Sequence, residues 1–421
     1  MMNDNQHIPS GYKPSPLGPI PEDWEVKRLG DLCENRGNYG LNAPATDYSD
    51  DLPTYLRITD IDDNGNFIHS TKKSVDNLSA KEYYLKEGDI VFARTGATVG
   101  KTYLYDTRDG QLVYAGFLIK FSPNPNKLIP YYLKAHTETK DYTNWVAITS
   151  QRSGQPGINA TEYCSLKLAI PPIKEQERIC NVLQLWDTAI EKQTALIEQL
   201  TLRKRGLMQQ LLTGKKRLKG FEGKWKEVRL GKMGVFFKGG GVPKDKITNT
   251  GNKCLTYGDL YTKYDFVISD VKSYIDDNTA NESVKIQYGD ICFAGSGETK
   301  EDIGKCAAFI DNEYGYAGGD IIVFRANDCN PITLSYILNS SDVIRQKSNM
   351  GQGHSVVHIY PYQLEKLLIK LPSRAEQDAI ATILMESDKE IEIQKQKLAA
   401  MQAQKKGLMQ VLLTGKKRII I

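Results

Sequence analysis

The chain has 421 residues, of which 40% are hydrophobic and 25% are charged, and its formal net charge is +4 at pH 7. This length exceeds what one hydrophobic core usually organises, so the sequence predicts at least two domains. No stretch approaches the eighteen or so apolar residues of a membrane-spanning helix, which excludes a helical membrane protein. The small positive charge permits contact with phosphates but falls short of the strongly basic surface that holds nucleic acid by charge alone.

The first 21 residues are polar and then rich in proline. They lack the basic start and the apolar stretch of a secretory signal, so we expect an N-terminal extension on a soluble protein of the cytoplasm. The seven cysteines are widely scattered, and no two of them have the spacing of a zinc knuckle. We therefore expect neither disulfides nor a metal site.

The sequence repeats itself at a fixed distance. The segment GLMQQLLTGKKR begins at Gly206, and GLMQVLLTGKKR begins 201 positions later at Gly407, with eleven of twelve residues identical. The same offset relates a W-x(3)-RLG segment at Trp24, a GDI-x-FA segment at Gly88 and a proline-led EQ segment at Pro171 to their second copies. Between these anchors the copies diverge almost completely. This pattern predicts a tandem duplication in which one framework carries two sets of loops.

Each copy has two parts. The first part mixes short β-branched and aromatic runs with Gly, Asn and Asp turns, which predicts a compact domain with a strand core. The second part follows a proline and continues without Gly or Pro for about thirty residues, which predicts one long helix. The predicted fold class is therefore α/β (α+β). The predicted divisions are an N-terminal extension 1–21, strand-containing domains 22–170 and 218–371, and helices 171–217 and 372–421.

Apolar residues in both predicted helices keep a four-three spacing, which is typical of a helix that pairs with another helix. Gln193 and Lys204 lie at seam positions, and the second copy has Gln394 and Lys405 at the matching positions. We expect the helices to pair antiparallel as a coiled coil in a pseudo-twofold repeat, with these polar residues helping to set the register. The alternative is that each helix packs only on its own domain. The predicted helix-pairing residues are Ile179, Leu183, Ile190, Ile197, Leu200, Leu207, Leu211, Ile380, Leu384, Ile391, Leu398, Met401, Leu408 and Leu412.

A Lys-Lys-Arg segment lies at the far end of each predicted helix, at 215–217 and at 416–418. Cations at this place complement the helix dipole, and they can also meet phosphate. Capping of the helix or docking of a partner is the simpler interpretation.

Together, the W-x(3)-RLG segment, the GDI-x-FA strand, the proline-led EQ helix start and the terminal LMQ-x-LLTGKKR segment resemble the specificity subunits of type I restriction-modification systems. The resemblance covers nearly the whole chain in both copies. It implies two target-recognition domains, each reading one half of a split, asymmetric site in double-stranded DNA. It also implies that the two helices act as a spacer and dock the modification subunits.

The same resemblance implies that this chain is not catalytic. Methyl transfer from S-adenosylmethionine to adenine would belong to methyltransferase (modification) subunits, two of which we expect as partners. Translocation and cleavage, which use ATP and Mg, would belong to restriction subunits. The chain itself would then bind no cofactor.

Three patterns with catalytic associations are incomplete. Residues 96–102 resemble a phosphate-binding loop but have three residues between the glycines, where that motif needs four. Residues 293–297 resemble the FxGxG loop of adenine methyltransferases, but the first copy breaks the pattern and no Asn- or Asp-Pro-Pro-aromatic motif exists. His354 and His358 have the spacing of metal ligands on a helix, but no third ligand is evident.

Side chains that read bases are chiefly Arg or Lys facing guanine and Asn or Gln facing adenine, carried on protruding loops. Two divergent, polar segments in each copy fit this description: the loop after the GDI strand, and the segment before the strand that closes the domain. For each residue alone, a solvated loop is the alternative interpretation. The predicted DNA-binding residues are Arg94, Thr95, Thr98, Lys101, Gln151, Arg152, Ser153 and Gln155 in the first copy, and Ser296, Thr299, Lys300, Lys347, Asn349, Gln352 and His354 in the second.

A second hypothesis comes from another functional class. The chain would be a coiled-coil assembly scaffold whose two domains bind protein or single-stranded nucleic acid. Strong preference for one duplex over a scrambled competitor at a stated salt concentration separates the two hypotheses.

Overall fold

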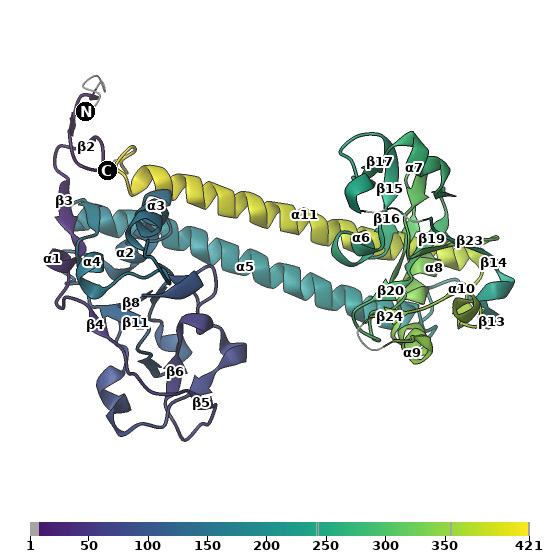
Figure 1. Cartoon of the computed structure of the whole chain (residues 1–421), viewed down its shortest axis with the longest axis horizontal. Helices are drawn as coiled ribbons and strands as arrows, with labels where there is room; N and C mark the ends of the chain where they lie inside the picture. The colour runs from purple at the N-terminus through teal and green to yellow at the C-terminus, as the bar shows by residue number, and fades with distance from the viewer. Residues whose placement is uncertain (1–7, 241, 243, 354–355, 420–421) are drawn as a thin grey trace. The chain divides into compact units, whose positions relative to one another are not determined.

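The computed structural model describes residues 8–240, 242, 244–353 and 356–419. The chain divides into two compact units: unit 1 comprises Met1–Thr194 with Gln396–Ile421, and unit 2 comprises Ala195–Lys395. Each unit therefore contains a strand domain, the beginning of the long helix that follows this domain, and the end of the long helix from the other copy (Figure 1).

Unit 1 contains two four-stranded sheets, with strand orders β4-β11-β8-β9 and β10-β6-β7-β5. Strand β8 carries the GDI-x-FA segment, and all four of its residues are buried. The second sheet has a parallel pair, β10 with β6. The strands are β4 (Asn38–Tyr39), β5 (Thr46–Asp47), β6 (Thr54–Leu56), β7 (Lys73–Ser74), β8 (Ile90–Ala93), β9 (Thr102–Leu104), β10 (Leu112–Tyr114) and β11 (Leu118–Phe121), with a small outer pair β1 (Tyr12–Lys13) and β2 (Ile20–Pro21).

Unit 2 repeats this plan. Its first sheet has the order β14-β23-β19-β21-β16, in which β19 carries the second GDI-x-FA segment, and its second sheet has the order β17-β15-β22-β18 with a parallel pair of β15 and β22. The predicted duplication is thus present in the strand order. The strands are β14 (Gly234–Lys238), β15 (Asn252–Leu255), β16 (Val267–Ile268), β17 (Tyr274–Ile275), β18 (Val284–Ile286), β19 (Asp290–Ala294), β21 (Cys306–Phe309), β22 (Gly315–Ala317) and β23 (Ile321–Ala326).

A two-stranded antiparallel pair joins the start of each domain to its end. Trp24, which precedes the first of these pairs, is fully buried, and its Nε1 donates a hydrogen bond to Glu175 Oε2 at 3.1 Å. The strand pair therefore positions the first turn of the helix that carries Glu175. The pairs are β3 (Glu25–Arg28) with β12 (Lys167–Ile170), and β13 (Lys226–Arg229) with β25 (Leu368–Leu371).

Two helices of 39 residues dominate the helical content, α5 (Ile173–Leu211) and α11 (Arg374–Leu412). Each ends before the predicted boundary, because Gly214 and Gly415 adopt positive φ angles of 67° and 72° and turn the chain. The shorter helices are α1 (Leu29–Leu32), α2 (Pro130–His136), α3 (Lys140–Thr149), α4 (Ala160–Cys164), α6 (Tyr257–Thr262), α7 (Asp277–Asn281), α8 (Pro331–Leu338), α9 (Ser341–Met350) and α10 (Pro361–Leu364).

The parts of the two long helices that lie in one unit run antiparallel. In unit 1, Glu175 at the start of α5 pairs with Arg418 at 2.6 Å, and Asp187 pairs with Lys405 at 2.5 Å, so the partner numbers fall as α5 advances. This decides against a helix that packs only on its own domain. The equivalent pairs in unit 2 are Glu376 with Arg217 and Asp388 with Lys204.

The apolar core of each unit is formed by the strand domain, the long helix that follows it and the end of the other long helix. In unit 1, the strand domain packs in one apolar cluster with Leu183 from α5 and Leu412 from α11. In unit 2, the corresponding cluster contains Leu384 from α11 and Leu211 from α5. Of the predicted helix-pairing residues, the buried ones are Ile179, Leu183, Leu200, Leu211, Ile380, Leu384, Ile391 and Leu412, and the partly buried ones are Ile190, Ile197, Leu207, Leu398, Met401 and Leu408.

A tyrosine from each strand domain joins the polar part of the seam. In unit 1, the Tyr131 hydroxyl donates to Asp187, which also accepts from Lys405. In unit 2, the Tyr336 hydroxyl donates to Asp388 in the same way. These carboxylates therefore connect the domain, its own helix and the helix of the other copy.

Replacing Lys405 with Met is expected to destabilise unit 1, because the carboxylate of Asp187 then keeps its tyrosine but loses its cation. The side chains of Lys405 and Asp187 are 13% and 34% exposed, so we expect a loss of roughly 2 kcal/mol, between the values for exposed and buried pairs. Urea unfolding measures this loss. The exposed neighbour Lys406→Met is the control, and equal stability of the two variants would contradict the prediction.

His136 of α2 makes unit 1 sensitive to acid. Its Nε2 is buried and has no hydrogen-bond partner among the described residues, and burial lowers the pKa of His136 from 6.5 to about 4. Between these two values the unfolded chain binds a proton that the folded chain does not. The free energy of unfolding therefore falls as the pH falls through this window, by up to roughly 1.4 kcal/mol per pH unit.

His136→Phe is expected to make this pH dependence shallower, because phenylalanine takes up no proton and can retain the edge contact with Tyr132. Urea unfolding at pH 7.5 and pH 5, followed by tryptophan fluorescence, measures the effect. Three of the four tryptophans (Trp24, Trp145 and Trp186) belong to unit 1. The same drop in stability for both proteins would show that His136 does not contribute.

Candidate nucleic-acid interface

The two segments predicted to read DNA lie side by side in each unit. In unit 1, Gly96 N donates to Pro156 O at 3.0 Å, and Ile158 N donates to Arg94 O at 2.9 Å. In unit 2, β20 (Ser296–Gly297) pairs antiparallel with β24 (Val357–His358), as Figure 1 shows. Main-chain hydrogen bonds thus hold the loop after the GDI strand against the segment before the closing strand in both copies.

The surface of this junction in unit 1 combines an arginine with a tyrosine. The guanidinium of Arg94 lies 4.9 Å from the ring centroid of Tyr39, whose side chain is 43% exposed. Tyr39 comes from β4, and its hydroxyl accepts a hydrogen bond from Ala160 N at 3.2 Å. Gln151, Ser153 and Gln155 are exposed in the adjoining segment. The structure therefore brings Arg94 together with the polar side chains predicted at residues 151–155.

Two other predicted cations of unit 1 are engaged by neighbouring carboxylates. Lys101 Nζ lies 2.6 Å from Asp63, and this ammonium holds the pKa of the Asp63 carboxyl below its usual value. Arg152 pairs with Glu162 at 2.5 Å and donates to the carbonyl of Thr149. Both pairs are solvent-accessible and therefore weak, so a phosphate can compete for these cations.

The hydroxyls of Thr95 and Thr98 make local contacts. Thr95 Oγ1 donates to Pro156 O at 3.4 Å, and Thr98 Oγ1 donates to Thr95 O at 3.4 Å. These bonds shape the loop and leave both residues partly exposed.

Two residues predicted to read DNA in unit 2, Ser296 and Lys347, lie in the interior and do not present their side chains at the surface. Ser296 is 4% exposed and bonds to His358 Nδ1 at 2.9 Å, because the loop forms β20. Lys347 is 1% exposed, because it lies one helical turn after the buried Val343 of α9 and shares its inward face.

The remaining predicted residues of unit 2 are on the surface. Lys300, Asn349 and Gln352 are exposed. Thr299 is exposed as well, with its hydroxyl bonded to Asp302 at 2.9 Å. The prediction for His354 lies outside the described residues.

Unit 2 has an aromatic ladder, His358, Tyr360 and Tyr362, that was not among the predicted site residues. The rings of His358 and Tyr360 are 6.5 Å apart, and those of Tyr360 and Tyr362 are 6.0 Å apart and nearly parallel. Tyr360 and Tyr362 are 39% and 51% exposed, and Lys366 Nζ lies 5.4 Å from the Tyr362 ring centroid. Comparing the two copies at the offset of 201 could have indicated the ladder, because the aromatic residues occur in the second copy only. The first copy has Gly157, Asn159 and Thr161 at these positions.

No group of three or more His, Cys, Asp or Glu side chains is placed to hold a metal ion within the described part of the chain. No described helix is long and apolar enough to cross a membrane.

A model of the type I restriction modification DNA specificity domain matches this chain twice, over residues 21–202 and 222–403. The two matches follow the repeat and cover most of the chain.

Among similar proteins is the putative type I restriction enzyme MjaX specificity subunit of Methanocaldococcus jannaschii, which is 29% identical over 97% of each chain. The MjaVIII specificity subunit of the same organism is 24% identical over 95% of this chain and 94% of the relative. The HindI specificity subunit of Haemophilus influenzae is 27% identical over 42% of this chain and 38% of the relative.

Solved structures share the fold. The S subunit of the type I restriction-modification system from M. genitalium has a TM-score of 0.56 and 14% identity, covering 93% of this chain and 96% of that subunit. A chain from a structural study of complex assembly and conformational transition in the type I R-M system has a TM-score of 0.58 and 18% identity, covering 94% of this chain and 99% of that chain. With the family model matched in two copies over most of its length, the chain belongs to the family of type I restriction-modification DNA specificity subunits.

Proposed function

We propose that this specificity subunit recognises a bipartite, asymmetric site in double-stranded DNA, with one half read by each unit. The observation that carries the proposal is where the two copies differ. Both units join the same two segments by main-chain hydrogen bonds, but these segments carry different side chains. One framework that presents two sets of polar and aromatic groups suits two readers of different base sequence.

The side chains differ in their chemistry. In unit 1, a guanidinium that stacks on the Tyr39 ring keeps its N–H edge free for a guanine, which Arg94 would contact in the major groove. In unit 2, Lys300 and Gln352 supply donors, while Tyr360 and Tyr362 offer exposed ring surface for thymine methyl groups or the sugar backbone.

The chemical steps of restriction and modification would occur on partners. We propose that two methyltransferase subunits, which bind S-adenosylmethionine, and restriction subunits, which use ATP and Mg, dock on this non-catalytic chain in the cytoplasm. Apolar side chains that remain exposed on the long helices support a docking role. Leu185, Leu202 and Ile393 are 71%, 63% and 50% exposed.

The proposal predicts the methylation pattern of the assembled complex. DNA methylated by this chain with a modification subunit should carry methyladenine in a split, asymmetric motif, which single-molecule sequencing of modified bases detects. Exchanging residues 22–170 for the same domain of another family member should change one half of the motif only. A continuous motif, a change in both halves, or no motif from a demonstrably active complex would favour the assembly scaffold.

Two single substitutions should each weaken recognition of one half-site. Arg94→Ala and Tyr362→Ala each remove a contact with one half-site, which should lower duplex affinity by roughly ten- to hundredfold at fixed salt. Competition with duplexes altered in one half identifies the half-site that has lost discrimination. Arg108→Ala and Tyr314→Ala are the controls, since both residues are well exposed in the same units. An equal effect of the controls would contradict the assignment.

A further inference from the structure

In each unit, the loop after the GDI strand ends in a glycine whose carbonyl is bonded to a helix side chain. In unit 1, the Tyr142 hydroxyl of α3 donates to Gly100 O at 2.8 Å. In unit 2, Lys347 Nζ of α9 donates to Gly304 O at 2.6 Å. Both glycines have positive φ, 86° and 69°, a conformation that favours glycine over other residues. The loop end is therefore attached in the same way in both copies, by different side chains.

The two donors come from different positions of equivalent helices. With the offset of 201, Tyr142 corresponds to Val343, and Val146 corresponds to Lys347. In α3 the hydrogen-bond donor is at the first of these two positions and the valine is at the second. In α9 the valine is at the first position and the donor is at the second. Positions four residues apart share one face of a helix, so either position can reach the glycine carbonyl.

Contacts at the glycines support this equivalence. A Cβ placed on Gly100 would lie 2.6 Å from Val146 Cγ1, and a Cβ placed on Gly304 would lie 3.0 Å from Lys347 Cδ. The second of the two helix positions therefore packs on the glycine in both units, whether it holds the valine or the lysine.

The attachment in unit 2 has an energetic cost. Lys347 is 1% exposed and has no carboxylate partner among the described ion pairs, and burial lowers its pKa. A buried ammonium without a counter-ion is unfavourable, and a valine at this position, as in unit 1, would avoid the cost. The hydrogen bond to Gly304 is the described contact that offsets it.

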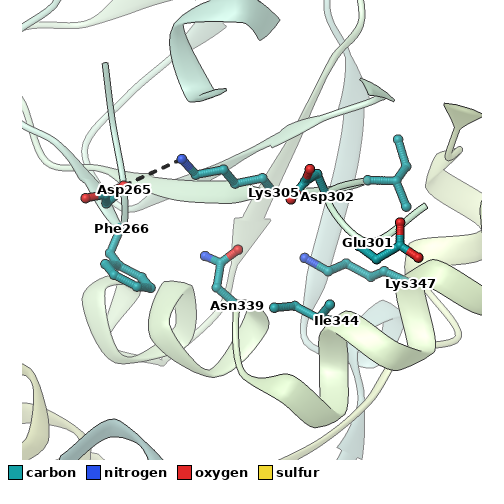
Figure 2. Close-up of a pocket in the computed structure, with 9 residues that line it drawn as sticks. Asp265, Phe266, Glu301, Asp302, Lys305, Asn339, Ile344 and Lys347 are labelled. Carbon is teal, nitrogen blue, oxygen red and sulfur yellow. Dashed lines mark ion pairs between the residues drawn. The ribbon is translucent and has the colours of Figure 1, made fainter. Parts of the chain in front are cut away.

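The bond lies beside a cavity between the loop and α9. Figure 2 shows Lys347 extending along this cavity with its ammonium directed toward Asn339. The cavity has a volume of about 170 Å³, and it is lined by Glu301, Asp302 and Ile303 of the loop together with α9 residues. Ile303 is buried in the same apolar cluster as Val343 of α9, so apolar packing holds the loop at this residue. The bond at Gly304 adds a polar attachment at the next residue, on the side of the cavity.

We propose that Lys347 is a positioning residue for recognition of the second half-site, and that Tyr142 has the same role for the first. This inference rests on the proposed function. Lys347 holds the end of the loop that presents Thr299 and Lys300, without touching DNA itself. Loss of the bond then weakens base discrimination by unit 2 and leaves discrimination by unit 1 intact.

The test uses the full chain in complex with its modification subunit. Lys347→Met, which keeps the side-chain length, should reduce discrimination at the second half-site by roughly tenfold or more, as expected for the loss of a hydrogen bond from a charged donor. Methylation rates on duplexes altered in one half measure this, and hydrogen exchange should become faster in residues 298–305.

Transfer of the unit 1 arrangement is the decisive control. The double variant Val343→Tyr with Lys347→Val places the hydroxyl donor and the valine as in unit 1, and it should restore discrimination. Tyr142→Phe, which removes one hydroxyl only, should weaken the first half-site alone, and it remains informative if Lys347→Met fails to fold.

Unchanged discrimination in both Lys347→Met and Tyr142→Phe would overturn the inference, as would an equal loss at both half-sites in either variant. These outcomes require a wild-type complex that methylates a split motif. If the wild-type complex yields no split motif, the proposed function itself fails, so the two failures are distinguishable.

Discussion

The architecture of each unit depends on the contact between the start of one long helix and the end of the other. An apolar seam with a seven-residue repeat tolerates a shift by a whole repeat, because the same kinds of side chain meet again. Such a shift would separate the partners of the ion pairs in the seam. Glu175 and Glu376 have side chains only 8% and 1% exposed, and an unpaired carboxylate at such a site is strongly unfavourable. Arg418 and Arg217 therefore fix the register of each antiparallel contact.

Through this contact, each copy of the repeat contributes to the core of the other copy's unit. The core of unit 1 includes Leu412 and Leu413 from the second copy, and the core of unit 2 includes Leu211 and Leu212 from the first copy. Each copy thus supplies the helix end that completes the core of the other. The offset of 201 predicted this architecture well, because it relates two ion pairs of unit 1, Glu175 with Arg418 and Asp187 with Lys405, to the two equivalent pairs of unit 2. What no local pattern indicated was the role of the terminal arginines. Their partners lie 159 and 243 positions away, so the sequence suggested capping of the helix, docking of a partner or contact with phosphate for these cations.

The candidate interface was predictable in its location and less so in its residues. Divergence between otherwise repeated anchors pointed to the two segments, and the structure joins them in both units. The sequence could not show that Lys347 is buried, because its exposure depends on helical phase: α9 begins at Ser341, which puts residue 347 in line with buried Val343. The ladder of Tyr360 and Tyr362 was missed for a different reason. These tyrosines lie beyond His354, the last residue of the second copy that was predicted to read DNA.

The buried anchors and the exposed ladder show how the framework permits divergence. At Tyr142 and Val343, and again at Val146 and Lys347, the copies differ while the bonded glycine carbonyl stays the same. At residues 358 to 362 the second copy has aromatic residues where the first has small or polar ones. In both copies, however, the residue before the helix donates its backbone N–H to a side chain three positions later, from Asn159 to Glu162 and from Tyr360 to Gln363. Since backbone anchors rather than particular side chains hold the segments together, the exposed side chains can change without loss of the fold. The proposed function needs this separation, because under it the two halves read different bases while each keeps the same attachment to the seam.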